Sequence, residues 1–512
     1  MMSESATRNA RAHRQLVSRR WSSSIFDRVG VLGDDTSYGH SGCVNALSWA
    51  RDGELLLSGG DDRTVQIWRM DPTLDDDYPF VCRSIIQTGH LANIFNTEML
   101  PYSSNIVTVA GDGQVRVHEV GEIGHSGPPA SPFSSRHACT HRLQCHENRV
   151  KRIATEDNPN LFLTVAEDGT VRQHDLRQNH QCNYDSCPPP LIQLDFELSG
   201  LSLSPLTPFQ FVVAGESPYG YLFDRRQMGR FLMEEKGMVE NGMTHCIRRF
   251  GRPAGAVEFD GIREHITGAR MSSQNGHELL LSYHADAVYL YSTRDAPEEE
   301  ALASSSGLLS SSKPMPFKRP RDGSSSHTDD EMMDIDDMDR DIDDNASDDD
   351  QGRDLFGNLD EYASRDYSGV PLILPRRRFA GARNVATIKD ANFLGPDDEF
   401  VVSGSDCGNV FIWRKDGTLH SILEGDSATV NVIEGHPHLP LFAASGLDTT
   451  VKLFAPVSGP SLFSRMERAE RIIAANATRQ RSIIRLQRRD VTALLAALAS
   501  DDQNTDTECR HQ

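Results

Sequence analysis

A unit of three short strands recurs along this chain, and this repetition restricts the fold more than any other feature of the sequence. The clearest unit opens at Gly39-His40, continues through residues 44–49 (VNALSW) and 54–60 (ELLLSGG), and ends at residues 64–68 (TVQIW). Apolar and polar residues alternate within such runs, which is typical of strands, and Gly and Asp residues between the runs predict tight turns. The sequence therefore indicates an all-β fold.

Six more units follow the first one. Their second strands are expected in the runs NIVTVAG, NLFLTVAEDG, FQFVVAG, HELLLSYHAD, EFVVSGSDCG and LPLFAASGLD. A single unit cannot bury both faces of its small sheet, whereas units stacked in a closed ring bury a continuous core and leave few exposed sheet edges. We therefore predict a seven-bladed β-propeller in which a variable outer strand completes each blade. Residues 29–32, which precede the first Gly-His, are expected to complete the seventh blade.

The turns of the units carry His and Asp residues at corresponding positions. Carboxylates at tight turns accept hydrogen bonds from backbone amides or from a neighbouring histidine, so we expect these residues to be structural. They are His40, Asp61, His90, Asp112, Asp168, Asp406 and Asp448. The sequence has no Walker A motif, no G-x-S-x-G elbow, no H-E-x-x-H motif and no dinucleotide glycine fingerprint. We therefore predict that the protein is not an enzyme and takes no cofactor.

An acidic insert, residues 295–375, interrupts the repeats. Between Asp295 and Glu361 there are 21 Asp or Glu against 6 Lys or Arg, a charge of −15 out of the total of −22. Low apolar content and clustered like charges cannot offset chain entropy, so disorder is predicted there. Within the insert, residues 318–321 (KRPR) resemble a nuclear import patch, and Ser347, which three Asp residues follow, resembles an acid-directed kinase site.

The rest of the chain carries a charge of only −7 and shows no basic face, so direct nucleic-acid binding is not predicted. No run approaches the roughly 18 apolar residues of a membrane span, and the first twenty residues lack the apolar stretch of a secretory signal. We therefore expect no membrane association and no secretion. The odd count of nine Cys residues favours reduced thiols.

One group of potential metal ligands lies in the third unit and the loop after it. The group comprises His137, Cys139, His141, Cys145, His146, His180, Cys182 and Cys187. Its spacings match none of the usual zinc patterns, so no metal site is predicted.

Five segments are predicted: an N-terminal extension (1–35), blades one to five (36–294), the insert (295–375), blades six and seven (376–457) and a C-terminal extension (458–512). In the first segment, Leu16, Val17 and Trp21 fall at helical spacing among arginines, so this stretch is an amphipathic helix, a disordered basic tail or a transit-like segment.

The C-terminal extension is predicted to be helical and basic. Residues 462–475 and 491–499 are expected to be helices, and residues 465–489 contain 8 Arg and 2 Glu. We expect these helices to pack on the propeller and to leave a basic surface for an acidic partner or for the insert.

Several repeats resemble those of a known family. The segments GHSGCVNALSW, SGGDDRTVQIW, EFVVSGSDCGNVFIW and PHLPLFAASGLDTTVKLFAP resemble the WD-repeat substrate receptors of cullin-four RING ubiquitin ligases, and in particular the nuclear receptor interaction branch, which has an acidic insert between the fifth and sixth repeats. The resemblance covers about residues 39–456 without the insert. It implies a non-catalytic receptor in the nucleus and cytoplasm, with damage-specific DNA-binding protein one as adaptor, cullin-four bound through it, and protein substrates that include nuclear receptors.

The adaptor-binding signature of this family is Trp-Asp-x-Arg at the end of a third strand. Here two consecutive units end in His174-Asp175-Leu176-Arg177 and Phe223-Asp224-Arg225-Arg226, with His174 and Phe223 in place of Trp. An arginine at a strand end presents a rigid fork of donors to a partner. Two interpretations stand: adaptor contact by these Asp-x-Arg pairs, or pairing of each Arg with its own Asp alone.

Family members also dock a helix that precedes the propeller, so the resemblance makes Leu16 and Trp21 candidate adaptor contacts. The alternative function is a nuclear transcriptional coregulator scaffold without a ligase role, because a propeller with an acidic arm suits both.

Overall fold

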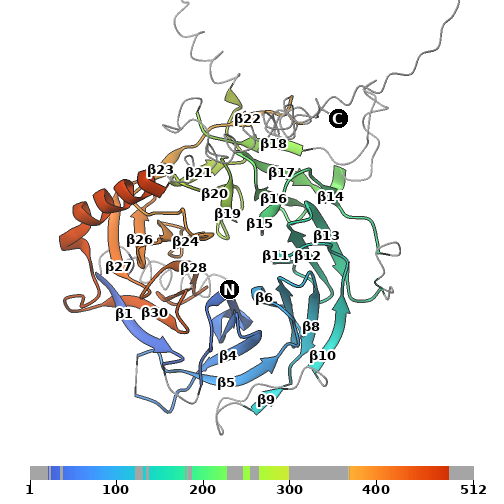
Figure 1. Ribbon diagram of the computed structural model, residues 1–512, viewed down its shortest axis with the longest axis horizontal. Coiled ribbons are helices and arrows are strands. Elements are labelled where there is room, and N and C mark those ends of the chain that lie inside the picture. Colours follow the sequence, from blue (N-terminus) through green and yellow to red (C-terminus); the bar gives the residue numbers. More distant parts are fainter. Residues whose placement is uncertain are drawn as a thin grey trace, which may run out of the picture.

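Seven small sheets form a closed ring in the computed structural model (Figure 1). The structure describes residues 21, 25–34, 38–75, 77–121, 131–133, 138–178, 182, 187–227, 246–253, 264–298, 367 and 369–483. Each sheet has four strands paired in antiparallel order, and two sheets gain a fifth strand. The predicted seven-bladed propeller is therefore confirmed. Within these ranges, no helix has the length and apolar character needed to span a membrane.

In each blade the strands follow one another from the central channel to the rim. Blade 1 contains β2 (Val44–Ala50), β3 (Leu55–Gly60), β4 (Thr64–Met70), β5 (Phe80–Gln87) and β9 (Ser131–Phe133); blade 2 contains β6 (Ile94–Met99), β7 (Asn105–Ala110), β8 (Val115–Glu119) and β10 (Cys139–Leu143); blade 3 contains β11 (Val150–Thr155), β12 (Leu161–Ala166), β13 (Thr170–Asp175) and β14 (Ile192–Gln193). Blade 4 contains β15 (Leu198–Leu203), β16 (Gln210–Gly215), β17 (Gly220–Asp224), β18 (Cys246–Phe250) and β22 (Leu372–Ile373); blade 5 contains β19 (Ile266–Met271), β20 (Glu278–Tyr283), β21 (Val288–Ser292) and β23 (Arg377–Phe379). Blade 6 contains β24 (Ala391–Leu394), β25 (Phe400–Gly404), β26 (Asn409–Arg414) and β27 (Leu419–Glu424); blade 7 contains β28 (Val430–Gly435), β29 (Phe442–Gly446), β30 (Val451–Val457) and β1 (Ile25–Leu32). Single turns of 3-10 helix span Arg51–Gly53, Arg225–Gln227 and Met466–Arg468, and an α-helix spans 469–483.

Burial along the strands follows the sequence pattern. All six residues of the apolar strand β3 are buried, because a strand in the middle of a blade has a blade packed on each face. The rim strand β5 alternates between buried and half-buried residues, because one of its faces meets solvent. The continuous apolar runs in the sequence thus mark middle strands, whereas half-buried positions interrupt both the outer strand β5 and the innermost strand β2.

The ring closes through its first and last strands. β1 pairs antiparallel with β30, with Ile25 opposite Val457 and Leu32 opposite Val451. The segment before the first repeat therefore supplies the rim strand of blade 7, whose other three strands come from the end of the repeat region.

The boundary after the acidic insert differs from the sequence prediction. β22, which falls inside the predicted insert, pairs parallel with β18 in blade 4, and β23, which falls inside the predicted sixth blade, completes blade 5 by pairing with β21. Asp295 and Arg376 form an ion pair of 2.6 Å where the chain leaves and re-enters the ring. The insert therefore interrupts blade 5 between its third and fourth strands, and residues 299–366 lie outside the part of the chain that the structure describes.

The C-terminal helix, residues 469–483, packs against blade 6. Ala469, Ile472 and Ile473 lie against the core cluster that includes Trp413. The side-chain amide of Asn476 donates a 2.8 Å hydrogen bond to the carbonyl oxygen of Gly381. The second predicted helix, 491–499, lies outside the described residues.

Trp21 does not act as the sequence predicts. It is only 2% exposed and belongs to the core cluster between blades 6 and 7. Its ring centroid lies 5.1 Å from that of Phe26 and 6.1 Å from that of Phe400. An indole enclosed in this way is not available to an adaptor, so the assignment of Trp21 as an adaptor contact is wrong. Leu16 lies outside the described residues.

Replacing Trp21 should weaken the fold. We expect Trp21→Ala to lower the free energy of unfolding by about 3–5 kcal/mol, because it leaves a cavity beside the closing strand. Leu462→Ala is the control, since Leu462 is 79% exposed. Chemical denaturation measures both variants. Unchanged stability in Trp21→Ala would contradict the buried position.

A chain of hydrogen bonds stabilises blade 1. The indole Nε1 of Trp68 donates to Ser58 Oγ at 2.9 Å, and Ser58 contacts Nε2 of His40 at 2.8 Å. Nδ1 of His40 donates to the carboxylate of Asp62 at 3.0 Å. Burial alone would raise the pKa of Asp62, but the hydrogen bond and charge of His40 and the turn amides outweigh it and lower that pKa.

Asp62, and not Asp61, is therefore the turn carboxylate of blade 1. Asp61 is exposed and accepts hydrogen bonds from the side-chain amide of Asn45 at 2.7 Å and from the Cys43 thiol, and not from the histidine. The sequence prediction chose the wrong member of the Asp-Asp pair.

Blades 2 and 3 repeat this arrangement with His in place of the Trp. His90 contacts Asp112 at 3.1 Å and Thr108 at 2.9 Å, and Thr108 lies 3.3 Å from His118. Burial lowers the pKa of His118 to about 3, so its imidazole is neutral. The corresponding chain in blade 3 consists of Asp168, His146, Thr164 and His174.

Blades 6 and 7 keep the turn carboxylate and replace the histidine. Asp406 accepts hydrogen bonds from the amides of Val385 at 2.7 Å and Ala386 at 3.0 Å, and pairs with the fully buried Lys389 at 2.5 Å. Asp448 accepts a hydrogen bond from the amide of Thr450 at 2.9 Å.

Replacing Asp61 and Asp62 one at a time should show which of them stabilises blade 1. We expect Asp62→Ala to lower the free energy of unfolding by about 2–4 kcal/mol, because it leaves His40, two backbone amides and a hydroxyl without their acceptor. Asp61→Ala should change it by less than about 0.5 kcal/mol. Urea titration of both variants measures the difference, and equal losses would refute the assignment.

Candidate functional site

Arg177 lies at the end of blade 3, two residues after Asp175. Its Nε and Nη2 atoms donate to the two carboxylate oxygens of Asp175, each at 2.8 Å, and its backbone amide donates at 3.1 Å. The hydrogen bond from Arg177 lowers the pKa of Asp175. The side chain of Arg177 is nevertheless 60% exposed. The carboxylate thus fixes the orientation of the guanidinium while much of it faces solvent.

Arg226 has the same geometry at the end of blade 4. Its Nε and Nη2 donate to Asp224 at 3.0 and 2.6 Å. The guanidinium also stacks over the ring of Phe209, 3.5 Å from the centroid, and its side chain is 62% exposed. A stacked, hydrogen-bonded guanidinium loses little conformational freedom when a partner binds it.

A third arginine fixes the spacing between these two motifs. Arg225 Nη1 pairs with Glu156 of blade 3 at 2.6 Å and lies 3.3 Å from the side-chain oxygen of Gln173. The Asp-Arg pairs therefore act within single blades, and Arg225 joins blade 4 to blade 3. The sequence shows that Arg225 is at a strand end, but its partner lies 69 residues away and is evident only in the fold.

Exposed apolar side chains share a face of the ring with these arginines. In every blade, the loops after the first and third strands lie on one face, which we call the arginine face because it carries Arg177 and Arg226. On this face, Leu74 is 47% exposed after β4, Tyr102 is 83% exposed after β6, and Leu206 is 62% exposed after β15. Exposed apolar groups and oriented arginines on one face are typical of protein interfaces.

The central channel opens on the arginine face through a polar cavity. This cavity has a volume of about 380 Å³, and the ends of the inner strands line it. Glu98, Arg270 and Glu434 lie in it, with Arg270 paired to Glu434 and bound to Asn392 at 3.1 Å. Burial, together with the negative charge of Glu434, raises the pKa of Glu98 to about 8.

The raised pKa of Glu98 predicts a pH effect on stability. In the folded state Glu98 keeps a proton that the unfolded chain loses above about pH 4.5, so stability should fall as the pH rises from about 5 to about 8. Glu98→Gln should remove this contribution, so the variant should melt increasingly above the wild type across this range. Glu119→Gln, an exposed position in the same blade, is the control. A difference between Glu98→Gln and wild type that does not change with pH would contradict the assignment.

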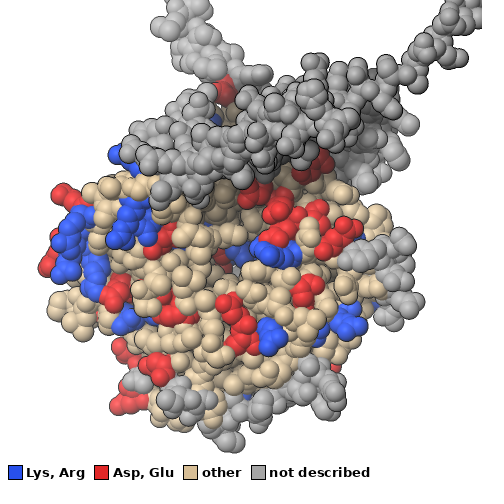
Figure 2. Space-filling view, viewed as in Figure 1, with Lys and Arg blue, Asp and Glu red and all other residues tan. Residues whose placement is uncertain are grey.

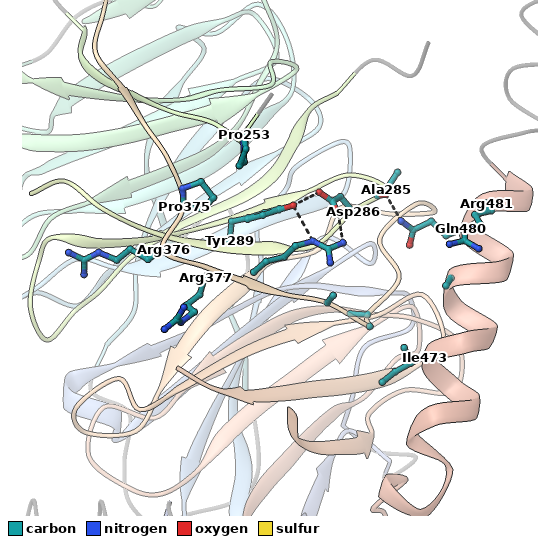
Figure 3. A pocket seen from close by; sticks show the side chains of 15 residues that line it. Pro253, Ala285, Asp286, Tyr289, Pro375, Arg376, Arg377, Ile473, Gln480 and Arg481 are labelled. Carbon is teal, nitrogen blue, oxygen red and sulfur yellow. Dashed lines mark hydrogen bonds and ion pairs between the residues drawn. The ribbon is translucent and has the colours of Figure 1, made fainter. Parts of the chain in front are cut away.

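A second concave surface lies between blade 5 and the C-terminal helix. The cavity has a volume of about 820 Å³, and its lining includes Arg376, Arg377, Arg378 and Arg481 (Figure 3). Arg378 is held by Asp286 at 2.8 Å. Lys and Arg side chains also gather over the C-terminal helix (Figure 2). Of the four arginines, Arg481 belongs to the C-terminal extension, whereas Arg376, Arg377 and Arg378 lie at or just before β23.

The structure brings together only part of the predicted metal-ligand group. Cys145, Cys182 and Cys187 lie close to one another, whereas His146 belongs to the hydrogen-bond chain of blade 3. Cys139 and His141 lie on β10. The candidate ligands His137 and His180, residues 318–321 and Ser347 fall outside the described residues, as does Leu16.

Comparisons with known proteins agree with the fold. The model of the WD domain, G-beta repeat matches residues 35–69 and 137–175. The chain is 35% identical to the WD repeat protein iqw1 of Schizosaccharomyces pombe over 49% of its own length and 31% of that protein. It is 25% identical to human WD and tetratricopeptide repeats protein 1, over 82% of this chain and 84% of the relative.

A third relative is the human DDB1- and CUL4-associated factor 6. It is 28% identical over 51% of this chain and 28% of its own length. The chain thus spans less than a third of the length of this relative and of iqw1. The matched repeats and the closed ring of seven blades together make this chain a WD-repeat β-propeller protein.

Proposed function

We propose that this chain is a substrate receptor of a cullin-four RING ubiquitin ligase, which binds the ligase adaptor through its arginine face. The observation that carries the proposal is the pair of Asp-x-Arg motifs on neighbouring blades, with guanidinium groups that are fixed by their own carboxylates and are 60% and 62% exposed. Such groups present charge-assisted donors to the carboxylates or carbonyls of a partner.

The arrangement combines the two interpretations left open by the sequence. Pairing of Arg177 with Asp175 and of Arg226 with Asp224 leaves most of each guanidinium outside the fold. The intramolecular pairs therefore orient the arginines for a partner. Tyr102 and Leu206 add apolar area on the same face, and contact with an adaptor there would cover them.

Two further lines support the proposal. The WD-repeat propeller is a scaffold for protein interaction, and one relative carries the name DDB1- and CUL4-associated factor 6. In this proposal the adaptor is damage-specific DNA-binding protein one, cullin-four binds through it, and the substrates are proteins such as nuclear receptors. The receptor acts in the nucleus and the cytoplasm.

Replacing both arginines tests the proposal. We expect Arg177→Ala/Arg226→Ala to weaken adaptor binding at least about tenfold, because interface arginines are frequent hot spots. The fold should survive, but the melting temperature should fall, because the Asp224 carboxylate is only 2% exposed and keeps the backbone amide of residue 226 while it loses the guanidinium. Binding is measured by surface plasmon resonance with purified adaptor, and folding by circular dichroism.

Arg149→Ala is the matched control. Arg149 is 62% exposed and pairs with Glu167 at 3.7 Å, but it precedes β11 and so lies on the face opposite the arginine face. Its replacement should leave adaptor binding unchanged. Normal binding by a folded double variant would refute the adaptor site. If the wild-type chain binds neither adaptor nor cullin-four but retains nuclear protein partners, it is instead a coregulator scaffold.

A further inference from the structure

Three cysteines from separate parts of the sequence meet at the outer edge of blade 3. Cys145 lies in the connection from β10 to β11 and is only 3% exposed. Cys182 and Cys187 belong to the loop between β13 and β14. The three Sγ atoms all lie within 4.8 Å of one another, and those of Cys145 and Cys182 are 3.6 Å apart.

The distance between the sulfur atoms suits ligands of one metal ion. Zn–S bonds of about 2.3 Å in a tetrahedral site place two sulfur atoms about 3.8 Å apart. A disulfide needs about 2.05 Å and joins only two of the three residues. None of the eight cysteines in the described ranges forms a disulfide.

The electrostatic surroundings also favour a cation. Three thiolates so close together repel one another unless a cation lies between them. Arg172 of β13 lies beside the loop of Cys187, because its Nη1 donates to the carbonyl of Pro188 at 2.8 Å. It would offset the remaining negative charge of three thiolates bound to a divalent ion.

The cluster lies where blade 3 has its weakest strand pairing. β14 pairs with β13 at only two positions, Thr170 with Gln193 and Val171 with Ile192, whereas the rim strand of blade 1 pairs along seven. A metal bound to Cys182, Cys187 and Cys145 would fasten the loop between β13 and β14 to the connection between blades 2 and 3.

We propose that Cys145, Cys182 and Cys187 form a structural zinc site, with three thiolate ligands and a fourth position for a further ligand. The spacing of the cysteines matches no common zinc motif, because the propeller and not a short hairpin brings them together. This proposal does not depend on the proposed binding of the adaptor.

Metal analysis of the full-length chain tests the proposal. The protein, purified under reducing conditions with added zinc, should contain about one zinc ion per chain by inductively coupled plasma mass spectrometry. Cys187→Ser, the mildest ligand change because Cys187 is only half-buried, should weaken zinc affinity by about 100-fold or more. Cys139→Ser is the control: Cys139 is half-buried on β10 and outside the cluster. It should keep its zinc.

Cobalt gives a second measurement on the unmodified chain, so the test does not depend on a variant that folds. After zinc is removed with a chelator, Co²⁺ should produce the thiolate-to-cobalt charge-transfer absorption of a site with several sulfur ligands, and zinc should abolish it. Lack of stoichiometric zinc together with lack of this absorption would overturn the proposal. A disulfide between Cys145 and Cys182, found by peptide mapping of protein kept under reducing conditions, would also overturn it.

Discussion

The antiparallel pairing of β1 with β30 is the contact on which the rest of the ring depends. It joins a strand that precedes the first repeat to the end of the repeat region, and it gives blade 7 the rim strand that its own repeat does not supply. Each blade is buried by its two neighbours, so a ring open at this seam would expose an apolar sheet face on both sides of the gap. Phe26 of β1 is fully buried and Trp21 packs on it, so both aromatic side chains stabilise the same seam.

Within the closed ring, the individual blades are stabilised in different ways. Blades 1 to 3 use a histidine to connect an inner hydroxyl to a turn carboxylate. Blades 6 and 7 keep the carboxylate and pair it with a lysine, and the lysine of blade 6 is fully buried. The shared requirement is an acceptor that satisfies the amides of the turn, and the donor opposite it can change. This freedom allows the repeats to diverge in sequence without a change of fold.

The repeat pattern was sufficient to predict the number of blades, the closure of the ring and the strand-end arginines. It was insufficient wherever the role of a residue depends on a contact with a segment that is distant in the sequence. Asp61 and Asp62 are chemically equivalent in the sequence, and only the position of His40 decides which one pairs with the histidine. Trp21 at helical spacing among arginines predicts a docking helix, but its indole fills a gap between two blades that no local pattern reveals. The sequence includes Cys145, Cys182 and Cys187 in one group of eight candidate ligands but does not single them out, because Cys145 and Cys182 are 37 residues apart.

The position of the acidic insert inside blade 5 affects how the chain is assembled and how it responds to cutting. During synthesis, β19, β20 and β21 emerge first, and their partner β23 emerges only after the whole insert, so blade 5 lacks its rim strand throughout that interval. In the finished ring, a protease that cuts the insert would produce two fragments that each contribute strands to blade 5. β23 would still pair with β21, β22 with β18, and β1 with β30. The protein would then persist as a nicked ring held together without a peptide bond at that point.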